Sequence, residues 1–312
     1  MQELSVMFTM DCEPAKIDVT AYGSMMSASG PDDYQESERS IRAYVATVKQ
    51  AGFSTTLFAH PEVAAAHSQL LLELQDEGAC LGLHVHPYKL KGGRYQHDLG
   101  AYSGPAQRQI LREASDVWEE ALGQKATYFR AGYFSANDFT FGVLKELGFK
   151  GGSLSIPGRI LPEHCSVWAG ADPYPHRAHL GFRQLRGDSD FIEIPVSMDF
   201  ERPTNRGAAN EQGYEWLYIP AERYEHPEIV RHIVQRVHAE AHPHGVIVTD
   251  THNDQDYSQG DHPARVNLDL TLRSIERCCA ELGVRPVDAT VARLCDRLRL
   301  EQKHEGTMGL GG

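Results

Sequence analysis

Two pairs of ionisable side chains, one acidic and one of histidines, follow apolar runs that have the character of buried strands. Asp11 and Glu13 come at the end of LSVMFTMDCE, and His84 and His86 come at the end of CLGLHVH. Side chains alternate between the two faces of a strand, so residues two apart project in the same direction. Carboxylate and imidazole groups suit zinc or a similar divalent cation. The two pairs therefore predict a hydrolytic metal site where two buried strands end.

The four side chains could divide the work of a metal-dependent hydrolase. Glu13, His84 and His86 would hold the cation, which needs an open position for water and lowers the pKa of that water. Asp11 would lie beside the water as general base. The plainer alternative makes Asp11 a capping residue and the histidines ordinary polar groups, but matching pairs on separate strands favour a site.

The identity of the third ligand is open from the residues alone. His97, in the loop after the second motif, is near enough in the sequence to take the place of His86. His60 also follows a strand-like run, but Pro61 comes directly after it and suits the first turn of a helix. We therefore expect His60 to be a residue of a helix start or of the rim.

Two further strand-like runs end in polar residues. In TYFRAGYF, a buried Arg130 could orient a catalytic carboxylate through a bidentate pair, and Gly132 permits close backbone approach to a ligand. The backbone N–H of Tyr133 could help to hold an oxyanion. In VIVTDTH, Asp250 lies two residues before His252, and an imidazole held by a carboxylate can protonate a leaving amine.

Strand-like and helix-like segments alternate along the chain. Short apolar runs occur at residues 4–10, 54–59, 81–85, 127–131, 152–156, 191–196 and 246–250. Helical spacing of apolar residues occurs at 39–52, 61–78, 107–123, 136–148, 226–242, 268–283 and 289–300. The alternation indicates an α/β fold whose parallel sheet is covered on both faces, as a distorted barrel or, alternatively, an open doubly wound sheet. In either fold the site gathers at the strand ends.

The composition is that of an ordinary globular protein, with 41% hydrophobic and 23% charged residues in a chain of 312. The net charge of −13 argues against nucleic acid or an anionic membrane as a partner. We expect one barrel domain over residues 1–301 and a disordered tail over 302–312. The segments 157–190 and 198–225, rich in Pro, Gly and polar residues, are expected to be long loops at the barrel rim.

The sequence contains no recognisable export signal, and no run approaches the roughly 18 apolar residues of a membrane span. Its six cysteines are scattered and lack zinc-ribbon spacing, so we expect reduced thiols and a cytoplasmic protein. Cys12 lies between the two acidic residues of the first motif. We expect it to be a small strand residue that faces away from them rather than a nucleophile.

Taken in order, FTMDCEP, TLFAHPEV, CLGLHVHPY, YFRAGYFSAN and VIVTDTH resemble the polysaccharide deacetylase superfamily (carbohydrate esterase family 4) over roughly residues 4–253. The resemblance implies a distorted (β/α)7 barrel, one divalent metal that is commonly zinc, and hydrolysis of an N-acyl group, usually the N-acetyl group of an amino sugar. It gives Asp11 the role of base and His252 that of acid, and it places Asp199 near the family's fourth motif.

The chain departs from the family's pattern at three places. The second Asp of Thr-Phe-Asp-Asp-Gly-Pro is Cys12 here, so the ligand role passes to Glu13. The family's two histidines are four residues apart, whereas Tyr88 takes the second place and the nearest imidazole is that of His86. Gly132 replaces the Pro of Arg-X-Pro-Tyr.

These departures and the missing export signal favour a small N-acylated sugar substrate over a cell-wall polymer. A sugar nucleotide, a glycoside or a natural-product intermediate that carries an N-acetylamino sugar would fit. The alternatives are a deformylase or cyclic-amide hydrolase on the same barrel, and a barrel that binds carbohydrate without hydrolysing it. Self-association of the chain is left open.

Overall fold

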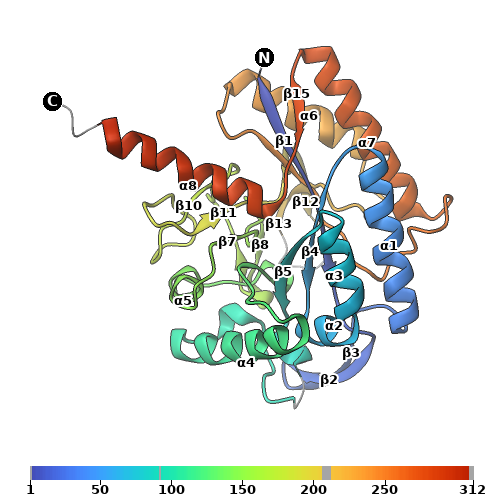
Figure 1. Cartoon of the computed structure of the whole chain (residues 1–312), viewed down its shortest axis with the longest axis vertical. Coiled ribbons are helices and arrows are strands. Elements are labelled where there is room, and N and C mark those ends of the chain that lie inside the picture. Colours follow the sequence, from blue (N-terminus) through green and yellow to red (C-terminus); the bar gives the residue numbers. More distant parts are fainter. Residues whose placement is uncertain (1, 91–92, 206–211, 309–312) are drawn as a thin grey trace.

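A curled sheet of mainly parallel strands lies at the centre of the protein (Figure 1). The computed structural model describes residues 2–90, 93–205 and 212–308. Across the sheet the order is β10 (His176–Arg177), β11 (Ile192–Glu193), β7 (Gly151–Gly152), β6 (Tyr128–Ala131), β5 (Cys80–Val85), β4 (Thr55–Ala59), β1 (Glu3–Cys12) and β14 (Val246–Val248). β15 (Arg285–Asp288) also pairs in parallel with β1, over the first residues of that strand.

Each of the seven expected strands is present, and the predicted distorted α/β barrel is confirmed. Ser197 links the two ends of the curl, because its backbone N–H donates to the carbonyl of Val248 at 3.2 Å and its hydroxyl accepts from the Val248 N–H at 2.9 Å. β15, with only four residues and a proline among them, was not expected. A strand this short shows no alternation of apolar and polar residues, so the sequence could not indicate its pairing with β1.

Helices cover the outside of the sheet. They are α1 (Tyr34–Gln50), α2 (Pro61–Ala66), α3 (Ser68–Asp76), α4 (Gly104–Leu122), α5 (Thr140–Glu146), α6 (His226–Glu240), α7 (Pro263–Leu282) and α8 (Val291–Met308). Short 3-10 turns are η1 (Pro87–Lys89), η2 (Leu99–Ala101), η3 (Gly132–Phe134) and η4 (Pro162–His164). Among the described residues, no helix combines the length and the apolar character that a membrane crossing requires.

Several helix boundaries differ from expectation, and two of the differences have a local cause. The helix expected over residues 61–78 is divided at His67, which has φ −119° and ψ 29° and ends α2 before α3 begins. α1 begins five residues earlier than the apolar spacing indicated, because the Asp33 side chain accepts from the backbone N–H of Glu36 at 2.7 Å and caps a polar first turn.

The end of the chain contains more helix than the sequence indicated. α8 continues to Met308 and so includes residues 302–308 of the expected disordered tail. Residues 309–312 lie outside the described residues. Figure 1 shows α8 extending away from the body of the protein toward the C-terminus.

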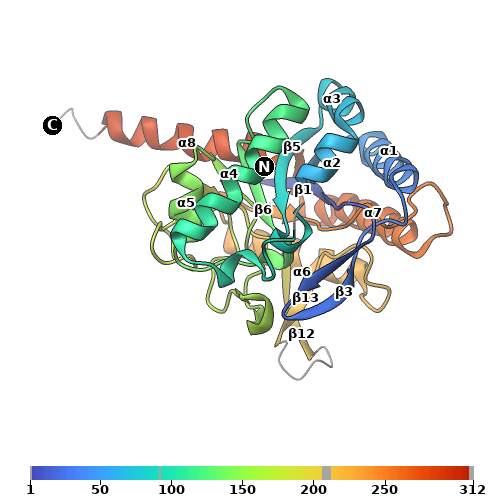
Figure 2. The ribbon, with the colours of Figure 1, turned by 90° about the horizontal axis from the view of Figure 1, so that it is seen from below.

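The expectation that residues 198–225 form a loop is wrong. β12 (Met198–Asn205) and β13 (Gln212–Trp216) form an antiparallel hairpin, and β13 also pairs with β8 (Ile160–Leu161), which pairs with β9 (Ser166–Val167). A register shift between Asp199 and Pro203 breaks the regular alternation that would reveal a strand in the sequence. A second hairpin joins β2 (Ile17–Ala21) to β3 (Ser24–Ala28), and both hairpins lie on the lower side of the view in Figure 2.

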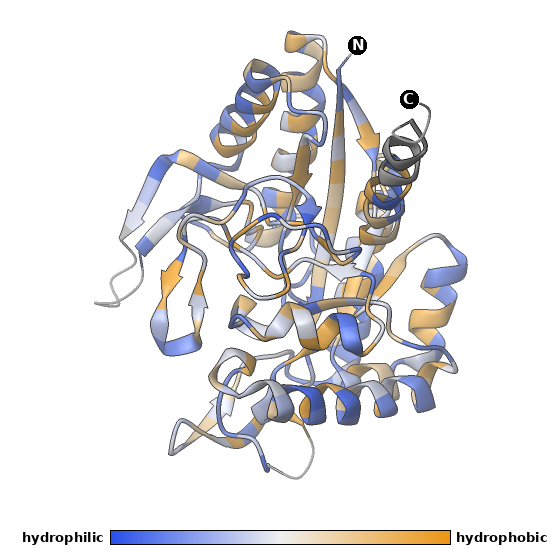
Figure 3. Cartoon of the chain, turned by 90° about the vertical axis from the view of Figure 1, so that its left-hand side faces the viewer, coloured by the Kyte–Doolittle hydropathy of each residue, from blue (hydrophilic) through white to orange (hydrophobic). Residues whose placement is uncertain are grey.

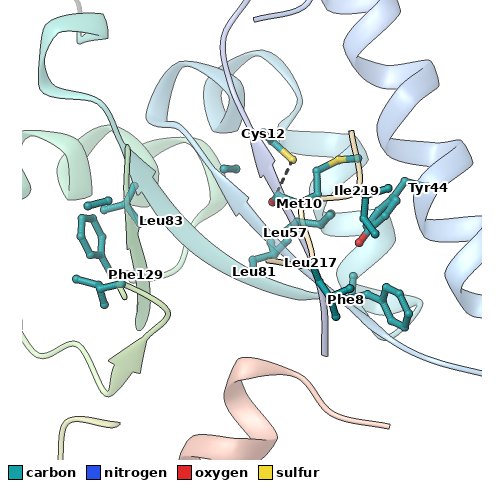
Figure 4. Close-up of a cluster of buried hydrophobic side chains, with 14 of the residues drawn as sticks. Phe8, Met10, Cys12, Tyr44, Leu57, Leu81, Leu83, Phe129, Leu217 and Ile219 are labelled. Atoms are coloured by element: carbon teal, nitrogen blue, oxygen red, sulfur yellow. Dashed lines mark hydrogen bonds between the residues drawn. The ribbon is translucent and has the colours of Figure 1, made fainter. Parts of the chain in front are cut away.

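Alternation along β1 divides its residues between two environments. Phe8, Met10 and Cys12 are fully buried in the core between the sheet and its helices, with Tyr44 of α1 among their neighbours (Figure 4). The hydropathy colouring of Figure 3 shows the same division in the helices, which are apolar on one side and polar on the other. Cys12 therefore faces the core, as predicted, and Asp11 faces the inside of the curl.

Candidate active site and metal centre

The acidic and histidine pairs meet at one end of the sheet. Asp11 and Glu13 lie at the end of β1, and His84 and His86 lie at the end of β5, on the far side of β4. Nε2 of His86 is 2.9 Å from Oε1 of Glu13, and Nε2 of His84 is 3.7 Å from the same oxygen. Nδ1 of His84 is 3.6 Å from Oδ2 of Asp11. All four side chains are buried.

The Glu13–His84–His86 cluster fits a divalent cation. Each residue offers one ligand atom, and the three atoms lie within 4.8 Å of one another. Both ring nitrogens of His84 and Nδ1 of His86 are buried and find no hydrogen-bond partner in the described part of the chain. Buried polar atoms normally have a partner. Unpaired imidazole nitrogens beside a carboxylate oxygen are the donor set that zinc-like ions bind.

The other two candidate histidines lie elsewhere. His97 is exposed and packs its ring against Tyr22, with 5.4 Å between the ring centroids, so it does not join the cluster. His60 is the N-cap of α2, as predicted, and its Nδ1 accepts from the backbone N–H of Glu62 at 3.4 Å.

Arg130 of β6 links three strand ends. Its Nη1 donates to Oδ1 of Asp11 at 2.9 Å and to Oδ1 of Asp250 at 3.0 Å, and it also donates to the hydroxyl of Thr9. The expected bidentate pair is therefore replaced by a bridge, in which one nitrogen holds two carboxylates. The guanidinium also lies over the ring of Phe58 at 4.4 Å. This buried cation holds Asp11 in place and leaves its Oδ2 toward His84.

His252 borders the cluster and has 26% of its side chain accessible. Its Nε2 lies 3.9 Å from Oε1 of Glu13, and its Nδ1 is 3.3 Å from the hydroxyl of Tyr218. Burial lowers the pKa of His252, but the charges of Asp250, Glu13 and Asp11 outweigh burial and raise the pKa above its usual value. Burial, with help from Asp11, raises the pKa of Asp250 to about 6. The imidazole is thus suited to carry a proton into the pocket.

Gly132 and His86 depart from the family's pattern together for a steric reason. A Cβ at position 132 would lie 2.2 to 2.4 Å from Nδ1, Cε1 and Cγ of His86. No side chain fits there, so the ring of His86 takes the space that a proline at position 132 would need. After this glycine the backbone turns sharply, with φ 54° at Tyr133 and 56° at Phe134.

Lys89 is a member of the site that sequence reasoning missed. It lies in η1, is 1% exposed, and its ammonium donates to Oε2 of Glu13 and to the carbonyl of Ser29 at 2.9 Å. Burial acts to raise the pKa of Glu13, but Lys89 and the nearby imidazoles of His86 and His84 outweigh it and hold that pKa well below its usual value. A lysine after HPY gives no signal in the sequence, because lysines are usually solvated.

A pocket of about 250 Å³ opens onto these groups. Its lining residues are Asp11, Glu13, Ser29, His86, Tyr133, Phe134, Arg159, Trp216, Tyr218, Asp250, His252 and Asp254. Sequence reasoning missed six of them. Phe134 and Asp254 lie in or beside a motif but have no role of their own in it, and the other four come from segments without a motif: Ser29, Arg159, Trp216 and Tyr218. Asp199 is not among the lining residues, and its carboxylate pairs with Nδ1 of His232 at 2.7 Å.

Substitution of Gly132 tests the packing against His86. In Gly132→Ala the new methyl group must displace the His86 ring, so we expect zinc affinity to fall about 10- to 100-fold, the loss typical when the surroundings of a metal ligand are disturbed. The measurement is competition with a chromophoric chelator. Gly104→Ala in α4 is the matched control, because a Cβ there meets Phe139 at an ordinary 3.5 Å. Equal zinc affinity in the two variants would contradict the packing argument.

Comparisons with known proteins agree with this fold. Residues 29–152 match the sequence model of the polysaccharide deacetylase family. A protein from Mycobacterium smegmatis that is assigned to the polysaccharide deacetylases superposes with a TM-score of 0.55 at 15% identity, covering 96% of this chain and 92% of that one. A protein from Pseudomonas aeruginosa PAO1 with the same assignment gives 0.55 at 12% identity, covering 96% and 92%.

PuuE allantoinase superposes with a TM-score of 0.54 at 11% identity, covering 94% of this chain and 89% of that one. The search of curated proteins gave no match to this chain. At such identities the solved structures establish the fold alone. The family match covers residues 29–152, which include the motifs of His84 and Arg130 but not those of Asp11 and His252. Residues 29–152 are thus similar to the polysaccharide deacetylase family, and the whole chain has the fold of proteins assigned to it, as the motifs predicted.

Proposed function

We propose that this protein is a metal-dependent hydrolase that removes the N-acetyl group from a small substrate containing an amino sugar. The observation that carries the proposal is the meeting of a base candidate, Asp11, and an acid candidate, His252, at the Glu13–His84–His86 cluster in one pocket. Zinc held by that cluster would supply Lewis-acid chemistry at the substrate carbonyl.

The roles of the protein side chains follow from their contacts. Arg130 holds one oxygen of Asp11 and leaves the other to accept a proton from the attacking water. Water adds to the carbonyl carbon, the C–N bond breaks, and the products are acetate and an amine. His252, whose pKa is raised, donates the proton that the departing nitrogen needs. The protein thus has one group to take a proton and another to return one.

The pocket supports a small substrate. Its volume of about 250 Å³ is at the lower end for ligand sites, which are typically about 300–1,000 Å³. Trp216 and Tyr218 line it with aromatic surface, which can pack against the apolar face of a sugar ring. One sugar ring with its acyl group fits this description better than a long polymer. Zinc as the native metal, a cytoplasmic location and self-association stay predictions.

Chelation and one substitution test the reaction. Hydrolysis of N-acetylated amino sugars should stop when the metal is removed and return when zinc is added. Asp11→Asn should lower kcat by about 10²- to 10⁴-fold, the usual contribution of a general base, because the amide cannot accept the proton. Asp138→Asn is the matched control, since that exposed carboxylate pairs only with Arg183 among the described ion pairs.

The substrate panel for this assay should compare acetyl, formyl and ureide compounds. Turnover of formyl or cyclic ureide compounds with inert acetyl compounds would favour the deformylase or cyclic-amide alternative. Sugar binding without any turnover would favour the non-catalytic barrel. Activity that is indifferent to chelator and survives Asp11→Asn would defeat the proposal.

The pH dependence tests His252 as acid. Since its proton-bearing form is the active one, activity should decline as pH rises through its raised pKa. Asp250→Asn removes the negative charge that contributes most to that rise, so the alkaline limb of kcat/KM should move to lower pH. The pH–rate profiles of both proteins with one substrate provide the measurement. An alkaline limb at the same pH in both would exclude the assigned role.

A further inference from the structure

Asp98 is a buried carboxylate beside the site that neither the motifs nor the proposed reaction uses. It directly precedes η2 and is 1% exposed. Its Oδ2 is held by Nδ1 of His164 at 2.8 Å and by the hydroxyl of Tyr22, which donates to it. Its Oδ1 finds no hydrogen-bond partner in the described ranges, and it lies 3.9 Å from Nδ1 of His86. One oxygen is therefore anchored and the other faces a candidate metal ligand.

The ring of His86 complements this carboxylate. Its Nε2 lies 2.9 Å from Oε1 of Glu13. Its other ring nitrogen, Nδ1, is buried and has no hydrogen-bond partner among the described residues. The backbone at Gly132 packs against the same ring and limits its rotation. A neutral imidazole that binds a cation through Nε2 must carry its proton on Nδ1. In this protein Asp98 is the carboxylate that Nδ1 faces.

We propose that Asp98 is a positioning residue for His86: its Oδ1 accepts a hydrogen bond from the Nδ1–H of His86 and so presents Nε2 to the metal. The inference rests on the proposed metal site and goes beyond it, because it assigns the tautomer of one ligand and the group that fixes it. Carboxylates commonly hold metal-binding histidines in this way. A closer approach of less than 1 Å turns the present 3.9 Å separation into a hydrogen bond.

Two segments of chain hold Asp98 in this position. Tyr22 forms the turn between β2 and β3 with φ 54°, and its backbone N–H donates to the carbonyl of Gln96 at 2.8 Å. His164 comes from η4 and stacks on the pocket residue Tyr133, with 3.8 Å between the ring centroids. The β2–β3 hairpin and η4 therefore fix the position of the carboxylate that faces His86.

Zinc affinity of the metal-free protein tests the proposal directly. Asp98→Asn keeps the shape but replaces the carboxylate by a weaker acceptor, so zinc should bind about 10- to 100-fold more weakly in competition with a chromophoric chelator. Tyr22→Phe keeps the carboxylate and removes one of its anchors, and a smaller loss is expected. Asp138→Asn is the matched control, because the same change at an exposed carboxylate that pairs with Arg183 outside the pocket should leave zinc affinity unchanged.

A second readout separates positioning from a general structural role. Long-range ¹H–¹⁵N spectra of the zinc-loaded parent should show His86 protonated at Nδ1 and bound through Nε2. Ligation through Nδ1 would overturn the proposal even if Asp98→Asn fails to fold. Parent-like zinc affinity in Asp98→Asn would overturn it alone, whereas a parent that binds no zinc would overturn both this proposal and the proposed function.

Discussion

The burial of charge at the strand ends is the constraint on which the site depends. Four carboxylates and two cations lie there with at most 3% of their surface exposed: Asp11, Glu13, Asp98, Asp250, Lys89 and Arg130. Removing a carboxylate from water costs several kcal/mol unless an opposite charge or hydrogen bonds compensate. Lys89 and Arg130 compensate part of this charge. A divalent cation among Glu13 and the two imidazoles would supply the two positive charges that the fully ionised set still needs. Burial raises the pKa of both Asp98 and Asp250, as expected for carboxylates whose negative charge is only partly compensated.

The departures from the family's motifs form one coherent rearrangement. Cys12 faces the core, as alternation along β1 requires, which leaves Glu13 as the candidate ligand beside Asp11. His86 takes the place of a histidine at position 88, and its ring fills the space beside Gly132. Tyr88 instead packs near the same ring, with 5.3 Å between the ring centroids. The change at position 132 makes room for the imidazole of His86, so the altered motifs are compatible with a complete site.

The strand periodicity made much of this site predictable. Because alternate residues share a face, the sequence placed Asp11 with Glu13 and His84 with His86, and strand order brought these pairs together with Arg130. Lys89 could not be predicted, because its burial depends on an ion pair with Glu13, which is distant from it in the sequence. The β12–β13 hairpin was missed because its strands contain Pro203 and an irregular register. Trp216 and Tyr218 line the pocket from that region, so these aromatic residues were less predictable than the charged residues at the strand ends.

Anomalous diffraction at the zinc absorption edge, from crystals grown with zinc, tests the central claim most directly. Convergence of these strand ends on a metal predicts one peak bonded to Glu13, His84 and His86, at about 2.0–2.2 Å from each ligand atom. Lys89 should still contact Glu13 through its other oxygen. Zinc bound only at other residues, or no peak in this pocket at saturating zinc, would contradict the account.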